Sequence, residues 1–135
     1  MAITPEEVAE TLSMVSQQNL DLRTITMGVS LFGCADEDMG RMCTKVYDRI
    51  TKTAERLVPT AEQLEREYGI PIANKRVSVT PIAQIAAACD DEDLTPIAQA
   101  MNRAAEALGI DFMGGFSALV QKGMGSADRR LIASI

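Results

Sequence analysis

The 135-residue sequence contains no histidine and no tryptophan. Without histidine the chain lacks the commonest general base and the commonest metal ligand of proteins, and neither a Ser-His nor a Cys-His pair can form. Aromatic residues make up only 4% of the chain, which leaves little surface for stacking nucleic-acid bases or sugar rings. Any catalysis would therefore depend on carboxylates, thiols, lysine, tyrosine or a bound cofactor, and the sequence identifies no cofactor.

Positive charge is also scarce. The chain has 13 basic against 19 acidic residues, a net charge of −6 and a pI near 4.6. Such a chain has no basic surface for a phosphate backbone or an anionic membrane. No apolar run approaches the roughly 18 residues of a membrane span, and the N-terminus does not have the pattern of an export signal. We expect a cytoplasmic protein that binds neither nucleic acid nor membrane.

Cysteines and acidic runs are the first candidates for chemistry. Cys34, Cys43 and Cys89 form no C-x-x-C pair, and their odd number predicts reduced thiols. Cys43 and Cys89 read as small core residues, whereas Cys34, at a predicted strand-to-helix junction, is the one candidate nucleophile or radical site. The acidic runs at 36–38 and 90–93 lack the spacing of a calcium loop and precede predicted helices, so we predict helix starts there and no metal site.

Helices and strands alternate along the chain. Predicted helix starts are a capping box at Thr4 to Glu7, Asp36, Pro59-Thr60, Thr80-Pro81, the acidic run before Leu94, and Ser126. Gly69 and Gly109 are predicted helix stops. Apolar residues recur at helical spacing from Val8 to Val15, Met39 to Leu57 and Leu94 to Leu108. With strands predicted near 24–31, 74–80 and from 110 onward, the chain reads as a single α/β domain over residues 1–135.

Two of these strands carry small polar residues on one face. Alternation places Thr24, Thr26, Gly28 and Ser30 on one face of the first strand, and Asn74, Arg76, Ser78 and Thr80 on one face of the second. If the strands are neighbours, their polar faces form a donor-rich surface with one guanidinium, suited to a carboxylate or a phosphate. The alternative is an ordinary solvated sheet face.

A glycine-rich segment gives a second candidate site. Lys122, Gly123, Gly125 and Ser126 precede the predicted C-terminal helix, where backbone N–H groups and one lysine can cradle an anion. The spacing matches neither a Walker A loop nor a dinucleotide-binding fingerprint. The alternative is a glycine turn followed by a Ser126 helix cap.

Four longer stretches carry a family resemblance: "NLDLRTITMGVSL", "GIPIANKRVSVTPI", "GIDFMGGFSALVQKG" and "LIASI". With them the chain resembles the N-terminal part of uncharacterised protein family 0210, also called domain of unknown function 711. The resemblance implies a formate-lyase-like fold, in which alternating helices and strands form part of a glycyl-radical-enzyme-like α/β barrel. It does not imply glycyl-radical chemistry, because neither the radical glycine motif nor the thiyl-forming cysteine loop is present. An ACT-domain protein is a partner that the resemblance implies.

Two functions follow as expectations. The first is part of an enzyme-like protein in which Arg76 neutralises a small anionic metabolite, Asn74, Ser78 and Thr80 orient it, and the Lys122 segment assists. The second is a noncatalytic regulatory or scaffolding subunit. Because the strands seen here cannot close a barrel, we expect the chain to associate with itself or with the remainder of the barrel.

Overall fold

The computed structural model describes residues 4–17 and 22–135 of the chain. Its elements are α1 (Pro5–Ser16), β1 (Leu22–Val29), the short 3-10 helix η1 (Phe32–Cys34), α2 (Met39–Ala54), α3 (Leu57–Tyr68), β2 (Ile72–Val79), α4 (Ile82–Ala86), α5 (Thr95–Leu108), β3 (Phe112–Gly114) and α6 (Ser126–Ala133). The predicted alternation of helices and strands is confirmed. None of the described helices is long and apolar enough to cross a membrane.

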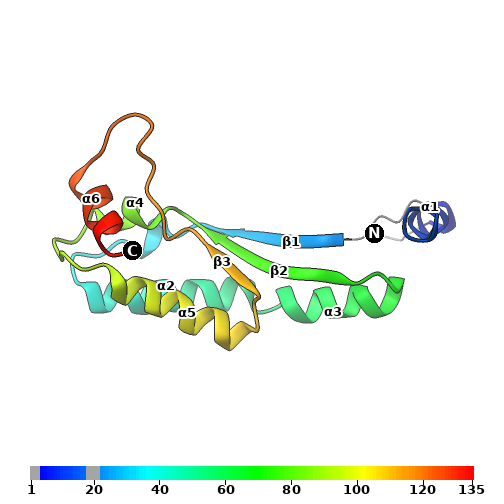
Figure 1. The fold of residues 1–135 in the computed structure, drawn as a ribbon. Coiled ribbons are helices and arrows are strands. Elements are labelled where there is room, and N and C mark those ends of the chain that lie inside the picture. Colours follow the sequence, from blue (N-terminus) through cyan, green and yellow to red (C-terminus); the bar gives the residue numbers. More distant parts are fainter. Residues whose placement is uncertain (1–3, 18–21) are drawn as a thin grey trace.

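The three strands form one parallel sheet in the order β1-β2-β3. The strands follow each other across the sheet in chain order. Because the connection between two parallel strands is nearly always right-handed, the connecting helices lie on the same face of the sheet. Figure 1 shows this result, with α2, α3 and α5 below the sheet, while the opposite face is open over much of its length. The architecture is therefore mixed α/β, with a sheet covered on one side.

The hydrophobic core lies between the covered face of the sheet and the helices α2 and α5. Val29, Val77 and Val79 point from the strands into this core, as the alternation predicts. The helices contribute stripes at three- and four-residue spacing, which include Met42, Val46, Ile50, Ile97, Met101 and Ala104. A second part of the core lies at the carboxyl ends of the strands, where η1, α4 and α6 meet.

The ends of the helices confirm some of the predicted signals. Thr4 and Glu7 form the predicted capping box of α1, with Glu7 accepting from the Thr4 N–H and Thr4 accepting from the Glu7 N–H. Gly69 and Gly109 end α3 and α5 in the left-handed conformation, with φ of 67° at both residues. A residue without a Cβ takes this conformation at no steric cost.

Val8 and Leu12, two residues of the apolar stripe predicted for α1, do not join the core. Val8 is 38% and Leu12 is 56% exposed, and the side chain of Val15 lies outside the described residues. Figure 1 shows α1 beyond the amino end of β1, away from the sheet and its helices. This position leaves Val8 and Leu12 without the burial that their spacing predicts.

Two helix starts are wrong by a few residues. The cap of α2 is Asp38, whose Oδ1 accepts from the Arg41 N–H at 2.8 Å. The predicted cap, Asp36, lies two residues earlier, accepts from the Asp38 N–H and pairs with Arg41 and Lys45. Pro59 does not separate α2 from α3, because α3 already begins at Leu57. Proline is tolerated there, since the first turn of a helix has no intrahelical partner for its N–H groups.

The predicted caps Thr80 and Ser126 are wrong as well. The residue before α4 is Pro81, and no side chain caps that helix, because the Thr80 hydroxyl accepts instead from the Leu31 N–H at 3.0 Å. At α6 the cap position is Gly125, and Ser126 is the first helical residue. The Gly125 N–H donates to the Asp128 carboxylate at 2.7 Å. An acidic side chain three residues into the helix thus replaces the serine cap.

Candidate functional site

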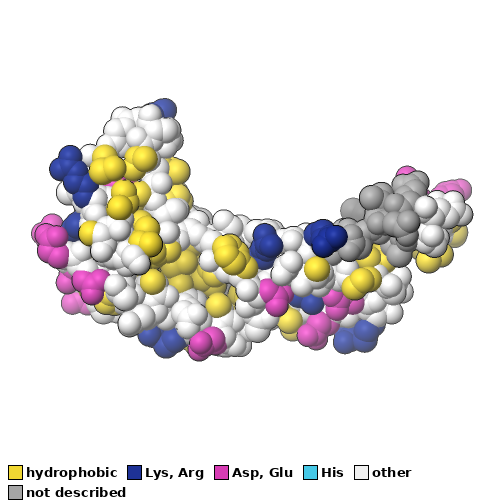
Figure 2. Space-filling view, in the orientation of Figure 1, with side chains coloured by type: hydrophobic (Ala, Val, Ile, Leu, Met, Phe, Trp, Pro, Cys, Tyr) yellow, Lys and Arg dark blue, Asp and Glu magenta, His cyan; other side chains and the backbone are white. Residues whose placement is uncertain are grey.

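The register of the sheet brings the two polar strand faces together. β1 and β2 are neighbours, with Thr24 opposite Asn74, Thr26 opposite Arg76, and Gly28 opposite Ser78. Paired residues of neighbouring strands point to the same side of the sheet, so all six lie on its open face. The predicted condition for a shared polar surface, that these two strands be adjacent, is confirmed. Figure 2 shows that the molecule is concave on the open side of the sheet, and the raised loop before α6 bounds this concavity at one end.

The third strand adds an aromatic neighbour to Arg76. β3 pairs with β2 so that Phe112 lies opposite Arg76 and Gly114 lies opposite Ser78. The guanidinium carbon of Arg76 lies 5.4 Å from the centroid of the Phe112 ring, within cation-π range. Phe112 itself is 58% exposed. The guanidinium is therefore held against a ring that also presents apolar surface to solvent.

Arg76 has no polar partner among the described residues. The structure contains no hydrogen bond or ion pair of its side chain there, and its Nε atom is buried without a partner. A buried donor that lacks an acceptor costs about 1–3 kcal/mol. Fixed positive charge on the open face is thus left unneutralised in the described part of the chain.

Lys75, the neighbouring residue, shows the opposite situation on the covered face. Its ammonium group lies 3.1 Å from Glu65 Oε1, and the same oxygen accepts from the Ile72 N–H at 2.7 Å. The Ile72 hydrogen bond, followed by that from Lys75, lowers the pKa of Glu65 below its ordinary value. The Lys75 N–H also donates to Asp111 at 2.7 Å. The cation on the helix side of β2 is therefore paired, in contrast to Arg76.

The other residues predicted to bind the ligand from the second strand differ in their contacts. Asn74 donates a long hydrogen bond, 3.5 Å, to the Arg23 carbonyl, and Ser78 is exposed on the open face. Thr80 lies at the carboxyl end of β2, where its hydroxyl oxygen accepts from the Leu31 N–H. Thr80 thus fastens the segment after β1 to β2.

The glycine-rich segment lies in a different place. Gly125 and Ser126 line a hollow of about 310 Å³ together with Gln84, Leu119 and Asp128, and no residue of β2 contributes to it. The loop before α6 rises away from the sheet in Figure 1. Gly125 and Ser126 therefore line a hollow to which Arg76 does not contribute.

The N–H groups of this segment are partly used. The Gly123 N–H donates to the Val120 carbonyl at 3.1 Å, and the Gly125 N–H donates to the Asp128 carboxylate. An anion at this helix start would meet a carboxylate already in place. Lys122 is exposed in the same loop.

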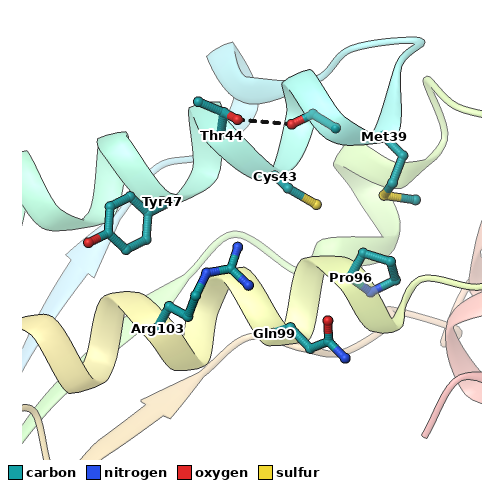
Figure 3. A pocket seen from close by; sticks show the side chains of 8 residues that line it. Met39, Cys43, Thr44, Tyr47, Pro96, Gln99 and Arg103 are labelled. Atoms are coloured by element: carbon teal, nitrogen blue, oxygen red, sulfur yellow. Dashed lines mark hydrogen bonds between the residues drawn. The ribbon is translucent and has the colours of Figure 1, made fainter.

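A groove that sequence reasoning missed lies between α2 and α5. It has a volume of about 540 Å³ and is lined by Met39, Gly40, Cys43, Thr44, Tyr47, Pro96, Gln99 and Arg103. Figure 3 shows Cys43 reaching down from α2 and Arg103 reaching up from α5. Thr44 and Arg103 lie on the surfaces of their helices. In a sequence, residues at such positions look like ordinary solvent-exposed residues. The groove depends on the packing of α2 against α5, which no local signal in the sequence predicts.

All three cysteines are buried. Cys34 is 1% exposed, and burial raises the pKa of its thiol, although Arg49 and Lys45 act in the opposite direction. Burial likewise raises the pKa of Cys43, with Arg103 opposing. Reactive thiols need a lowered pKa and access to solvent. The structure therefore gives no support to Cys34 as a nucleophile.

The acidic runs have structural partners. Asp36 pairs with Arg41 at 2.7 Å and with Lys45 at 2.8 Å, and these hydrogen bonds, Arg41 first, lower the pKa of Asp36 strongly. Asp93 accepts from the Thr95 N–H at the start of α5. Across residues 4–17 and 22–135, no three His, Cys, Asp or Glu side chains converge as metal ligands would.

Comparisons with known proteins agree on one family. The sequence pattern of the family described as Uncharacterised ACR (DUF711) matches residues 13–135. A UPF0210 protein of Lactiplantibacillus plantarum is 60% identical over 128 residues, which cover 95% of this chain and 29% of that protein. UPF0210 proteins of Lactobacillus helveticus and Syntrophotalea carbinolica are each 56% identical, over 96% and 100% of this chain. The chain thus spans about 30% of the length of these relatives, and it belongs to the DUF711 family.

Proposed function

We propose that the open sheet face binds a small anionic metabolite, with Arg76 as its charged partner. The observation that carries this proposal is the guanidinium left without an acceptor among the described residues. A guanidinium offers several N–H donors in a rigid plane, and it forms paired hydrogen bonds with carboxylates and phosphates. Binding an anion there would neutralise the charge that the fold has placed on this face.

The neighbours of Arg76 suit such a ligand. Thr26 lies directly opposite Arg76 and Asn74 lies one row away on the same face, and both offer uncharged hydrogen-bonding groups. Ser78 provides another hydroxyl on the other side of Arg76. We place the segment of Lys122, Gly123, Gly125 and Ser126 outside this site, since Gly125 and Ser126 line a separate hollow. Thr80 contributes by holding the strand ends together.

The proposal extends to the longer relatives. A parallel sheet in sequential order, with its helices on one face, is an arrangement that a closed α/β barrel repeats around its axis. We propose that this chain corresponds to an arc of a formate-lyase-like barrel in a cytoplasmic protein, with the open face turned toward the centre. The Arg76 surface would then lie inside a cavity of an enzyme-like protein.

Thermal shift in the presence of sodium benzoate and of sodium phosphate tests the Arg76 site. Arg103 supplies a matched control, because it is an exposed arginine without a hydrogen bond or ion pair among the described residues, and it lies on α5 rather than on the open face. We expect Arg76→Ala to abolish the ligand-induced shift and Arg103→Ala to preserve it. An unchanged shift in Arg76→Ala, or an equal loss in both variants, would contradict the proposal.

A second candidate function, a noncatalytic subunit that pairs with another chain, is favoured by the edge at β3. A hollow of about 390 Å³ lies beside this strand, and its apolar lining includes Met101, Ile110, Met113 and Phe116. Within the described sheet, β3 pairs on one side only. An unpaired strand edge beside an apolar hollow can accept a further strand and helix.

Three partners follow from this candidate function: a second copy of the chain, the remainder of the barrel, or an ACT-domain protein. Light scattering over a range of protein concentrations tests the first. Self-association predicts a mass that rises to a multiple of 14.6 kDa. A monomer throughout that range would exclude a stable homo-oligomer and leave the other two partners for direct binding assays.

A further inference from the structure

We infer that the ligand of the open sheet face is a flat monocarboxylate, held by the Arg76 guanidinium and lying over Gly28, Ser78 and Gly114. This inference rests on the proposed anion site and specifies the class of its ligand. Two independent features carry it: the amount of positive charge on the face, and the shape of the surface beside Arg76.

Among the described strand positions that share the open face by register, Arg76 is the one with a fixed positive charge. By register and alternation, the other positions of β1, β2 and β3 on the open face are all uncharged: Leu22, Thr24, Thr26, Gly28, Ile72, Asn74, Ser78, Phe112 and Gly114. Lys75 faces the helices and is paired with Glu65. One guanidinium matches the single charge and the planar oxygen pair of a carboxylate.

A phosphate would find fewer partners here. Phosphate sites commonly add the free N–H groups of a helix start to their basic residues. The nearest helix start along β2 is that of α4, and its N–H groups are already used. The Ile82 N–H donates to Gly115, the Ala83 N–H donates to Ser117, and the Gln84 N–H donates to Pro81. The charge and the donors thus favour a carboxylate over a dianionic phosphate.

The rows of the sheet define the shape of the site. Thr26, Arg76 and Phe112 form one row across the three strands, and Gly28, Ser78 and Gly114 form the next row on the same face. The second row has almost no side-chain bulk. With strands about 4.8 Å apart it spans roughly 10 Å, so a flat ligand can approach the backbone there.

The atoms near the two glycines show how much space lies above the row of Gly28, Ser78 and Gly114. A Cβ added at Gly28 would meet no atom within 4 Å, so the space above Gly28 is open. A Cβ added at Gly114 would lie 3.5 Å from Cε1 of Phe112, so that ring borders the row. Phe112 can therefore contact the apolar part of a ligand whose carboxylate lies against Arg76, while the Thr26 and Ser78 hydroxyls serve as hydrogen-bonding neighbours.

Isothermal titration calorimetry measures the affinity of the full chain for three small molecules and so tests the class of ligand. Benzoate is flat with one carboxylate, benzyl alcohol has the ring without the charge, and phenyl phosphate has the ring with a dianionic group. We expect benzoate to bind at least tenfold more tightly than either of the others. We expect Arg76→Ala to weaken the binding of benzoate at least tenfold, and Arg103→Ala to leave the affinity for benzoate unchanged.

Gly28→Val tests the shape of the site. Because the added side chain enters open space in a strand, and valine is a good strand former, we expect an unchanged melting temperature and at least tenfold weaker benzoate binding. Gly28→Ala, a smaller change at the same position, should retain the fold and weaken binding less. Benzoate binding that is lost in Arg76→Ala but unchanged in Gly28→Val would overturn the flat-ligand part of the inference.

The outcomes separate this inference from the proposed function. Phenyl phosphate that binds more tightly than benzoate, in an Arg76-dependent manner, would preserve the anion site and overturn the carboxylate assignment. If neither benzoate nor phenyl phosphate shows Arg76-dependent binding, the proposed anion site fails with it.

Discussion

Replacing Gly115 by alanine should destabilise the protein far more than the same change at Gly123. Both glycines have left-handed φ angles, 124° and 126°. A Cβ at Gly115 would overlap Cγ2 of Val79 and lie 2.7 Å from the Val79 carbonyl oxygen, whereas a Cβ at Gly123 would meet no atom within 4 Å. The comparison therefore separates steric overlap from backbone strain.

The expected magnitudes follow from these two terms. Strain at a left-handed φ costs about 1–3 kcal/mol, which both variants share. Overlap with packed atoms adds about 1–3 kcal/mol for Gly115→Ala alone. The Gly115 carbonyl also accepts from the Ile82 N–H at 2.9 Å, so a shift of this residue would disturb the start of α4. We expect the free energy of unfolding of Gly115→Ala to be about 2 kcal/mol lower than that of Gly123→Ala.

Urea unfolding followed by circular dichroism measures this difference. For a domain of this size the slope of free energy against urea is about 1–3 kcal/mol per molar, so the midpoints should differ by about 1 M. Equal midpoints for the two variants would refute the close approach of Gly115 to β2.

Three further predictions concern stability. The pKa of Glu65 is lowered in the folded state by the Ile72 N–H and then by Lys75, so its stabilisation is present above about pH 4.3 and is lost as the pH falls through the folded value. Melting temperatures of Glu65→Gln should therefore fall less steeply with acid than those of the wild type. Thr80→Val should cost about 1–3 kcal/mol in urea unfolding, because the Leu31 N–H loses its acceptor, and Thr80→Ser should cost less. Arg130→Met should cost about 2 kcal/mol, since it removes charged donors to three carbonyls after and within α4, and an unchanged midpoint would contradict that role.

Local signals predicted much of the fold. The capping box at Thr4 and the glycine stops at Gly69 and Gly109 act over a few residues, so they can be read from sequence. Alternation correctly gave the two faces of β1 and β2. Where two signals competed, sequence reasoning chose wrongly: Asp36 and Asp38 can both cap α2, and only the hydrogen bond to Arg41 selects Asp38.

The candidate site was less accessible to prediction. Alternation identifies which residues of a strand share a face, but it does not give the register between strands far apart in sequence. The pairing of Arg76 with Phe112 depends on that register, and so does the row of Gly28, Ser78 and Gly114. The separation of Gly125 from Arg76 likewise depends on the path of the loop before α6, for which the sequence contains only turn signals.

The most direct test of the Arg76 site is a map of backbone amide shifts during titration of the ¹⁵N-labelled chain with benzoate. The account predicts that the largest changes lie on the open face, at Thr26, Gly28, Arg76, Ser78 and Phe112, and that they disappear in Arg76→Ala. Changes centred instead on the groove at Arg103, or on the loop at Gly125, would contradict it.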